Sequence, residues 1–385
     1  MESINVLVVD DTILYRKVIG DVIAAIPGAK VCGTAANGRF ALTKIDTLKP
    51  DLITLDVEMP EMNGLELLEE LARSGKKLPR IIMVSTLTTR GGDMTIRALE
   101  LGAYDFITKP QSGTASENMA RIKTQLTPVV TALIQEKQFR SRLQNARATL
   151  SKTRKPVAST PSTGARLSKQ DRFTPSSSRR ETPAIPTRSS VPRRKAEVVT
   201  IGISTGGPNA LAAMLPQLPA DIGVPILIVQ HMPPVFTASL ANSLNNKCAI
   251  EVKEAEDGDL LKPGLALIAP GGKQMRVEAH RDGVNRMVRI TDDPPENSCK
   301  PSADYLFRSV ANHYVGRATG VIMTGMGQDG FKGLCTMKEN GAWILGQDEA
   351  SCTVYGMPKA PADAGILDRV VPLSGIAKAL LNTLA

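Results

Sequence analysis

Three residues of this chain have side chains of the kinds that nucleophilic hydrolysis requires, and each follows an apolar run. Ser204 lies in the segment G-I-S-T-G (202–206), directly after the run Val198–Ile203. Glycines on both sides allow a tight turn that exposes the hydroxyl at the end of a strand. A serine needs a neighbouring base to become a nucleophile. Of the three histidines, His231 is the predicted base, because it follows the next apolar run, 225–230.

A carboxylate that orients the imidazole completes this type of site. Asp329, in the segment T-G-M-G-Q-D-G (324–330), is the predicted orienting acid; a helix N-cap is its alternative interpretation. Backbone N–H groups near Thr205 and Met326 are predicted to stabilise the oxyanion. The glycines alone also suit a phosphate-binding loop, but the Lys-Ser/Thr ending of such loops is missing. The chain order Ser-His-Asp argues against a standard lipase or esterase fold.

A second set of reactive side chains lies in the first 110 residues, again at the ends of apolar runs. Asp10, Asp11 and Asp56 bring three carboxylates to one edge of a parallel sheet, where strand ends converge. Carboxylates this close repel one another unless a divalent cation lies between them, and their hard oxygens favour Mg²⁺. Lys109 adds a positive charge, and Ser85 adds a hydroxyl suited to a phosphoryl group.

Both sets require parallel strands to position them. The fold class predicted is α/β, with two doubly wound parallel-sheet domains joined by a flexible linker. Predicted strands in the first domain are 4–9, 29–33, 52–55, 80–84 and 104–107. Predicted strands in the second domain are 198–203, 225–229, 265–269, 318–324, 342–345 and 366–371, with a hairpin of 275–277 and 287–290. The predicted division is 1–125, a helical extension and linker over 126–195, and 196–385.

Charge separates the linker from the domains. Residues 140–195 hold fifteen Lys and Arg against two acids, a net charge of +13, so the rest of the chain carries −4 of the total +9. Such a stretch cannot bury enough apolar surface to fold and is predicted to be a flexible spacer after a helix over 129–140. A nucleic-acid partner is therefore not expected. Five scattered cysteines, the lack of an apolar span and the absence of a signal-like N-terminus predict a cytoplasmic protein without membrane insertion.

Residues 1–125 resemble a two-component receiver domain, which is flavodoxin-like. The resemblance implies that a histidine kinase supplies a phosphoryl group to Asp56. It implies that Mg²⁺ is held by Asp10, Asp11, Asp56 and the backbone carbonyl of Glu58 or its neighbour. It also implies a set of switch residues: Ser85, Phe106 and Lys109. For Phe106, plain core packing is the alternative.

The whole chain, apart from the linker, resembles the CheB-type chemotaxis protein-glutamate methylesterases, whose catalytic domain is Rossmann-like. The segments that carry the resemblance are 202–208, 230–232, 269–272, 300–304, 323–330 and 347–352. It implies hydrolysis of glutamate γ-methyl esters in methyl-accepting chemoreceptors, deamidation of receptor glutamines, and no cofactor in the catalytic domain. Gln274 stands where relatives often have histidine, and Gln328 where they often have asparagine.

The fusion suggests that the unphosphorylated receiver covers Ser204 and that phosphorylation shifts the population towards an open form. One alternative is a receiver-controlled interaction module without turnover. A transcription regulator is a third possibility, disfavoured because the basic charge lies in the linker and residues 196–385 have an α/β pattern.

Overall fold

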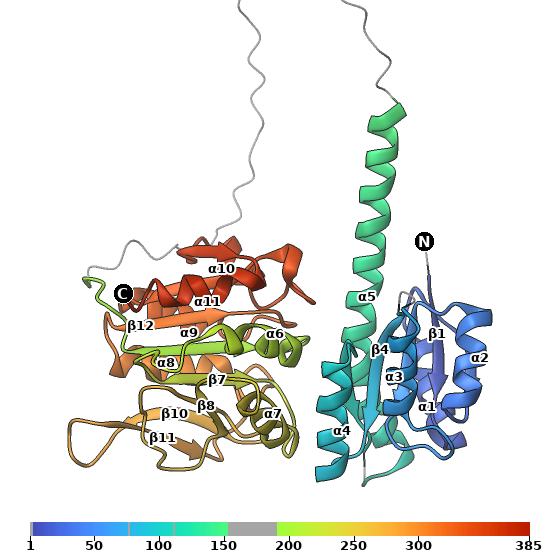
Figure 1. Ribbon diagram of the computed structural model, residues 1–385, viewed down its shortest axis with the longest axis horizontal. Coiled ribbons are helices and arrows are strands. Elements are labelled where there is room, and N and C mark those ends of the chain that lie inside the picture. The colour runs from blue at the N-terminus through green and yellow to red at the C-terminus, as the bar shows by residue number, and fades with distance from the viewer. Residues whose placement is uncertain (1–2, 76–77, 111, 153–190) are drawn as a thin grey trace, which may run out of the picture.

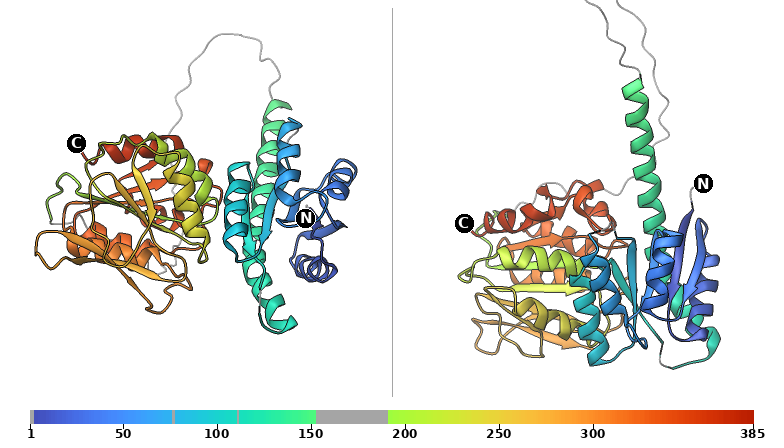
Figure 2. Two further views of the ribbon diagram at one scale, coloured as in Figure 1. Left: turned by 60° about the horizontal axis from the view of Figure 1, so that its bottom comes forward. Right: turned by 45° about the vertical axis from the view of Figure 1, so that its right-hand side comes forward.

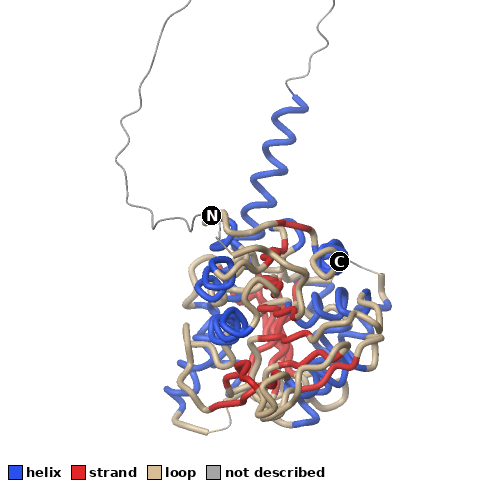
Figure 3. The backbone as a smooth tube through the Cα atoms, turned by 90° about the vertical axis from the view of Figure 1, so that its left-hand side faces the viewer, coloured by secondary structure: helices blue, strands red, loops and turns tan. Residues whose placement is uncertain are grey.

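The computed structural model describes residues 3–75, 78–110, 112–152 and 191–385, without the side chains of 139, 140 and 142–152. Two α/β domains lie side by side, and each has a central sheet with helices on both faces (Figures 1 and 2). Seen from the side, the strands form a middle layer between helices, as Figure 3 shows. The predicted α/β fold class is confirmed. Among the described residues, no helix is long and apolar enough to cross a membrane.

The first domain has a parallel sheet of five strands in the order β2-β1-β3-β4-β5. Its strands are β1 (Ile4–Val9), β2 (Ala29–Ala35), β3 (Leu52–Asp56), β4 (Arg80–Ser85) and β5 (Asp105–Thr108). Its helices are α1 (Ile13–Ala24), α2 (Gly38–Leu48), α3 (Gly64–Arg73), α4 (Thr89–Glu100) and α5 (Ala115–Lys152). Runs of Val, Ile and Leu form the central strands because helices bury both faces of the sheet.

The second domain has a parallel sheet of seven strands in the order β14-β13-β12-β6-β7-β9-β8. The strands are β6 (Val198–Ile203), β7 (Ile226–Gln230), β8 (Glu251–Glu254), β9 (Leu265–Ile268), β12 (Ala318–Ile322), β13 (Trp343–Gln347) and β14 (Arg369–Val371), and a separate hairpin pairs β10 (Gln274–Ala279) with β11 (Arg286–Thr291). The helices are α6 (Gly207–Met214), α7 (Phe236–Asn245), α8 (Ala303–His313), α9 (Phe331–Glu339), α10 (Lys359–Asp363) and α11 (Leu373–Leu381). The chain leaves β6 towards β7 on one side and returns to β12 on the other, so the strand order reverses beside β6. Ligands of open α/β sheets bind at such reversal points.

The predicted strands are present in both domains, and the hairpin is confirmed. The short edge strand β8 was not predicted, because its sequence E-V-K-E has no apolar run. The predicted strand 366–371 is wrong at its start, since β14 begins only at Arg369.

The helix predicted over 129–140 is too short. Helix α5 begins at Ala115, continues through Pro128 and ends at Lys152, so residues 141–152 are helical rather than linker. Its apolar side chains, among them Ile122, Val130 and Ile134, pack on the first sheet. Tertiary packing therefore outweighs the cost of a proline in the helix. Residues 153–190 of the predicted linker lie outside the described residues. Residues 191–195 are described, and Arg193 pairs there with Asp368 of the second domain at 2.8 Å.

The two domains contact each other through α4 and β5 of the first and α6 and α7 of the second (Figure 2). Phe106 stacks on Phe236 with ring centroids 4.7 Å apart. The Glu100 carboxylate lies 2.6 Å from the Lys247 ammonium. Tyr104 donates a hydrogen bond of 3.2 Å to the Thr353 carbonyl. The interface thus combines an aromatic stack with polar pairs at its margin.

Candidate active site and phosphorylation site

Ser204 lies at the carboxyl end of β6, in a turn that only glycines permit. Its backbone N–H donates to the Thr324 carbonyl after β12 at 3.0 Å, and its carbonyl accepts from Gly207 N–H at 2.7 Å. Gly206 has φ +74°, and a Cβ there would collide with Thr353. Helix α6 begins at the next residue, so its N-terminal end lies beside the serine, as in a nucleophile elbow.

His231 occupies the equivalent position after the neighbouring strand β7. Ile203 pairs with Gln230 in the β6–β7 ladder, and His231 N–H donates to the Ile203 carbonyl at 3.1 Å. Adjacent strands lie about 4.8 Å apart, so the register brings His231 beside Ser204. Among the described residues the Ser204 hydroxyl makes no hydrogen bond. Catalytic hydrogen bonds often close only in the substrate complex.

Asp329 is held firmly and faces His231. Its Oδ2 lies 2.8 Å from His231 Nε2, which leaves the other ring nitrogen, Nδ1, outside this bond. The carboxylate is buried and accepts hydrogen bonds from the Asn297 amide at 2.8 Å and the Ser302 hydroxyl at 2.7 Å. It also accepts from the Ala303 N–H at 2.6 Å, the first residue of α8. A helix N-terminus favours a negative charge at this position.

These contacts set the protonation of the pair. Burial acts to raise the pKa of Asp329, but the hydrogen bond and charge of His231, with Asn297 and Ser302, lower it to about 2. Burial acts to lower the pKa of His231, but the Asp329 hydrogen bond and the Cys299 sulfur raise it to about 9. Near pH 7, Asp329 is therefore ionised and His231 is mostly protonated, so the fraction of neutral His231 rises as the pH approaches 9.

The two residues predicted to supply oxyanion donors flank the serine. Thr205 follows Ser204, and its carbonyl accepts from the Thr324 hydroxyl at 3.0 Å. Met326 lies on the loop after β12, where the flanking Gly325 pairs with Val354. Within the described part of the chain, neither the Thr205 N–H nor the Met326 N–H donates to another group.

Three further residues of this site were not predicted. Gln230 is buried, and its amide donates to the Ser204 carbonyl at 3.0 Å and to the His231 carbonyl at 3.1 Å. Gln230 is the last residue of β7, and this position at a strand end could have marked it as a site residue. Asn297 and Cys299 lie on an irregular loop between the hairpin and α8, where no periodicity marks a site.

That loop places the Cys299 sulfur 3.7 Å from His231 Nδ1. Gln274 helps to hold the loop: its amide donates to the Cys299 carbonyl at 3.4 Å, and its Oε1 accepts from the Ser302 N–H at 2.9 Å. The glutamine that departs from the expected family pattern is thus part of the scaffold around the histidine.

The predicted acidic set of the first domain also comes together. Asp10 Oδ2 and Asp56 Oδ2 lie 2.8 and 2.6 Å from the Lys109 ammonium. Each of Asp10, Asp11 and Asp56 offers an oxygen within 4.8 Å of the others, a donor set that fits a hard cation such as Mg²⁺. Asp11, Asp56 and the exposed Glu58 line a cavity of about 370 Å³. Burial raises the pKa of Asp56 to about 7, with Lys109 acting in the opposite direction.

The two remaining predicted switch residues connect this site to the domain interface. Ser85 ends β4, and its hydroxyl donates to the Gly91 carbonyl at 3.2 Å in the first turn of α4. Phe106 stacks on Phe236 of the second domain. Phe106 is half-buried and also packs against the hydrophobic core, so core packing stays an alternative to the switch role.

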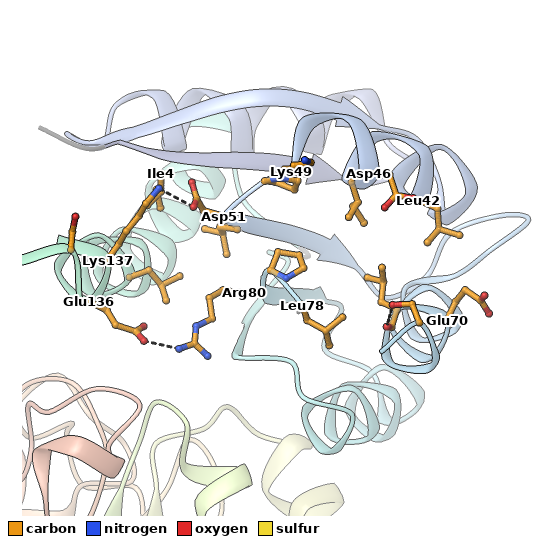
Figure 4. Close-up of a pocket in the computed structure, with 18 residues that line it drawn as sticks. Ile4, Leu42, Asp46, Lys49, Asp51, Glu70, Leu78, Arg80, Glu136 and Lys137 are labelled. Carbon is orange, nitrogen blue, oxygen red and sulfur yellow. Dashed lines mark hydrogen bonds and ion pairs between the residues drawn. The ribbon is translucent and has the colours of Figure 1, made fainter. Parts of the chain in front are cut away.

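A larger cavity, of about 1220 Å³, lies at the opposite edge of the first sheet, lined partly by the extended helix α5 (Figure 4). Two ion pairs border it: Arg80 with Glu136 at 2.6 Å and Lys137 with Asp51 at 2.8 Å. It contains none of the predicted site residues.

Comparison with known proteins gives concordant matches for both domains. Residues 199–380 match the family model CheB methylesterase, and residues 6–121 match the response regulator receiver domain. The chain is 56% identical over 383 residues to the protein-glutamate methylesterase/protein-glutamine glutaminase of Desulfotalea psychrophila, covering 100% of this chain and 99% of that one. It is 43% identical over 383 residues to the protein of the same name from Treponema denticola, covering 99% and 98%. The crystal structure of the Thermotoga maritima CheB methylesterase catalytic domain aligns at 38% identity with a TM-score of 0.47, covering 49% of this chain and 99% of that one.

Proposed function

Because this chain belongs to the family of receiver-linked protein-glutamate methylesterases/protein-glutamine glutaminases, we propose that Ser204, His231 and Asp329 form its catalytic triad. Family membership makes it a hydrolase of chemotactic adaptation that acts on methyl esters of chemoreceptor glutamates and on receptor glutamines. The observation that carries the assignment is the 2.8 Å bond between His231 Nε2 and a buried Asp329, one strand away from Ser204.

The reaction then follows the acyl-enzyme route. His231 Nδ1 takes the Ser204 proton as Oγ attacks the side-chain carbonyl carbon of the substrate. The N–H groups of Thr205 and Met326 stabilise the oxyanion. His231 returns the proton to the leaving oxygen, so that methanol departs and a glutamyl ester remains on Ser204. With a glutamine substrate the proton goes to the amide nitrogen, and ammonia departs. Water, activated by His231, hydrolyses that ester and regenerates the serine.

Asp329 acts through His231. It keeps the proton of the neutral ring on Nε2, so that the Nδ1 lone pair faces the reacting hydroxyl. It also stabilises the imidazolium that forms during each half of the reaction. The Gln230 amide donates to both the Ser204 and the His231 carbonyls, and so fixes the backbone of the nucleophile relative to that of the base.

We further propose that the receiver is phosphorylated on Asp56 by a histidine kinase. Asp10, Asp11, Asp56 and the Glu58 carbonyl would hold Mg²⁺, which, when bound, neutralises charge on the transferred phosphoryl group. Lys109, already in contact with Asp10 and Asp56, is positioned to pair with a phosphoryl oxygen. Ser85 would exchange its bond to Gly91 for one to the phosphoryl group, which loosens the first turn of α4.

The domain arrangement supports control of access to Ser204. Receiver residues contact a loop and a helix that flank the serine: Tyr104 bonds Thr353 of the loop, and the Ala103 carbonyl accepts from Asn209 of α6 at 3.1 Å. We propose that phosphorylation separates α4 from α7 and opens this face, and that the chain acts in the cytoplasm on the cytoplasmic regions of receptors. We keep the proposed division into a receiver of 1–125, an extension and linker of 126–195, and a catalytic domain of 196–385.

The test is methanol release from methyl-labelled receptor membranes by the parent chain and by Ser204→Ala, with and without a small phosphodonor and Mg²⁺. We expect activity that rises with the phosphodonor and is lost in Ser204→Ala. Equal release by both proteins would exclude Ser204 as the nucleophile. No release by either protein would favour a receiver-controlled interaction module.

A further inference from the structure

We propose that Cys299 and His231 form a binding site for a thiophilic divalent cation, for which Zn²⁺ is the best fit, and that the bound cation stops ester hydrolysis. The two candidate ligand atoms, Cys299 Sγ and His231 Nδ1, lie 3.7 Å apart. Ligands about 2.3 Å (sulfur) and 2.0 Å (nitrogen) from a tetrahedral Zn²⁺ are separated by about 3.5 Å. Closing the pair around a cation therefore needs only a small adjustment.

The surroundings already have the form of a metal site. A histidine that binds zinc usually donates its other ring N–H to a carboxylate, which fixes the ring and its tautomer. Here His231 Nε2 faces Asp329 Oδ2 at 2.8 Å, and Asp329 is held by Asn297 and Ser302. His231, Cys299 and Asp329 together are one of the two groups of potential metal ligands found among the described residues.

The Cys299 loop is held in place and open to solvent. The Cys299 N–H donates to the Glu296 carbonyl at 2.8 Å, and its carbonyl accepts from the Glu296 N–H at 3.1 Å and from Gln274 Nε2 at 3.4 Å. Cys299 is partly exposed, so a hydrated cation has access. Two protein ligands leave two positions of a tetrahedral ion for water.

Binding at this position and catalysis exclude each other. The same Nδ1 lone pair would accept the Ser204 proton or bind the cation. Binding converts the Cys299 thiol to a thiolate and releases its proton to water, so the sulfur and nitrogen bonds to the ion form without any redox step. The other group of ligands, Asp10, Asp11 and Asp56, offers only oxygens and favours Mg²⁺. The chain thus has separate sites for a hard activating cation and a softer inhibitory one.

The experiment uses the full chain with Mg²⁺ in excess, so that the receiver carboxylates are occupied. Zn²⁺ is titrated against methanol release, and each variant is compared with its own rate without Zn²⁺. Co²⁺ is titrated separately, because a thiolate ligand gives a charge-transfer band that needs no turnover. The variants are Cys299→Ala, the similarly sized Cys299→Ser and, as a matched control, Cys335→Ala, which removes another partly exposed thiol.

We expect Zn²⁺ inhibition and one thiolate-bound Co²⁺ per chain in the parent and in Cys335→Ala. In Cys299→Ala the band should disappear and the Zn²⁺ affinity should fall by at least about 10-fold, the lower end of what loss of an outer partner causes. The site is overturned if Cys299→Ala and Cys299→Ser remain as sensitive as the parent, or if the parent gives no band. The cobalt band reports the site even if the proposed triad is wrong.

Discussion

Two buried carboxylates of this molecule, Asp56 at the end of β3 and Asp329 on the loop after β12, have opposite electrostatic environments. Both are buried at the carboxyl edge of a parallel sheet. Burial raises the pKa of Asp56 to about 7, whereas His231 and two further hydrogen-bond donors lower that of Asp329 to about 2, against the effect of burial. Position in the fold is thus shared, and the neighbouring groups decide the charge.

The difference agrees with the roles proposed for the two carboxylates. Asp329 accepts from the first turn of α8 and from side chains, which fixes its charge and its direction. Asp56 faces one lysine and a second carboxylate, Asp10, that opposes its ionisation. The few fixed partners of Asp56 suit the proposed binding of a cation and a phosphoryl group, whereas the five hydrogen-bond partners of Asp329 suit its proposed role of orienting His231.

The largest effect should come from removing the charge of the orienting carboxylate. Asp329→Asn keeps the size of the side chain but presents an amide N–H towards His231, which favours the wrong tautomer. We expect kcat to fall by about 10⁴-fold, as triads of this type show. Initial rates of methanol release from labelled receptors measure it, and circular dichroism checks the fold. A fall of less than tenfold would mean that Asp329 does not orient the base.

The matching change in the receiver should act on control alone. Asp56→Asn removes the phosphoryl acceptor and leaves the residues around Ser204 in place, so we expect the response to phosphodonor to vanish. The ratio of rates with and without phosphodonor should then be about one. A response that persists would place the phosphorylated residue elsewhere.

Both sets of site residues could be predicted because they follow apolar runs, either directly or, for Asp329, after a short glycine-rich loop, and this is a local signal. Sequence analysis did not find Cys299 or Asn297, because their loop meets His231 and Asp329 only through the tertiary fold. The predicted end of helix α5 was too early because the residues after Arg140 are mostly polar and basic. The register of the parallel strands places most of the site residues, whereas the positions of residues on irregular loops could not be predicted.

The interface offers a smaller effect that tests whether the two sites are coupled. Glu100 pairs with Lys247 at 2.6 Å on the margin between α4 and α7. An exposed ion pair contributes about 0.2–1 kcal/mol, so we expect Glu100→Lys to raise the unphosphorylated rate by at most about fivefold. The double variant Glu100→Lys/Lys247→Glu should restore the parent rate. If Glu100→Lys leaves the unphosphorylated rate unchanged or lowers it, this ion pair does not stabilise the form in which the receiver covers Ser204.

The smallest expected effect is a shift in the pH profile, and it sharpens the contrast between the two carboxylates. His231 acts as a base only when neutral, and its pKa is raised to about 9 by the Asp329 hydrogen bond and the Cys299 sulfur, despite burial. The rate at low substrate should therefore fall as the pH drops below about 9, in proportion to the neutral fraction. Cys299→Ala removes one of the two influences that raise the His231 pKa, so the pH–rate profile should move to lower pH. Because Asp329 remains, the midpoint of the profile should stay above the ordinary histidine pKa. A profile unchanged in Cys299→Ala would show that Asp329 alone sets the basicity of the histidine, and the fixed carboxylate would then account for the whole difference from the receiver site.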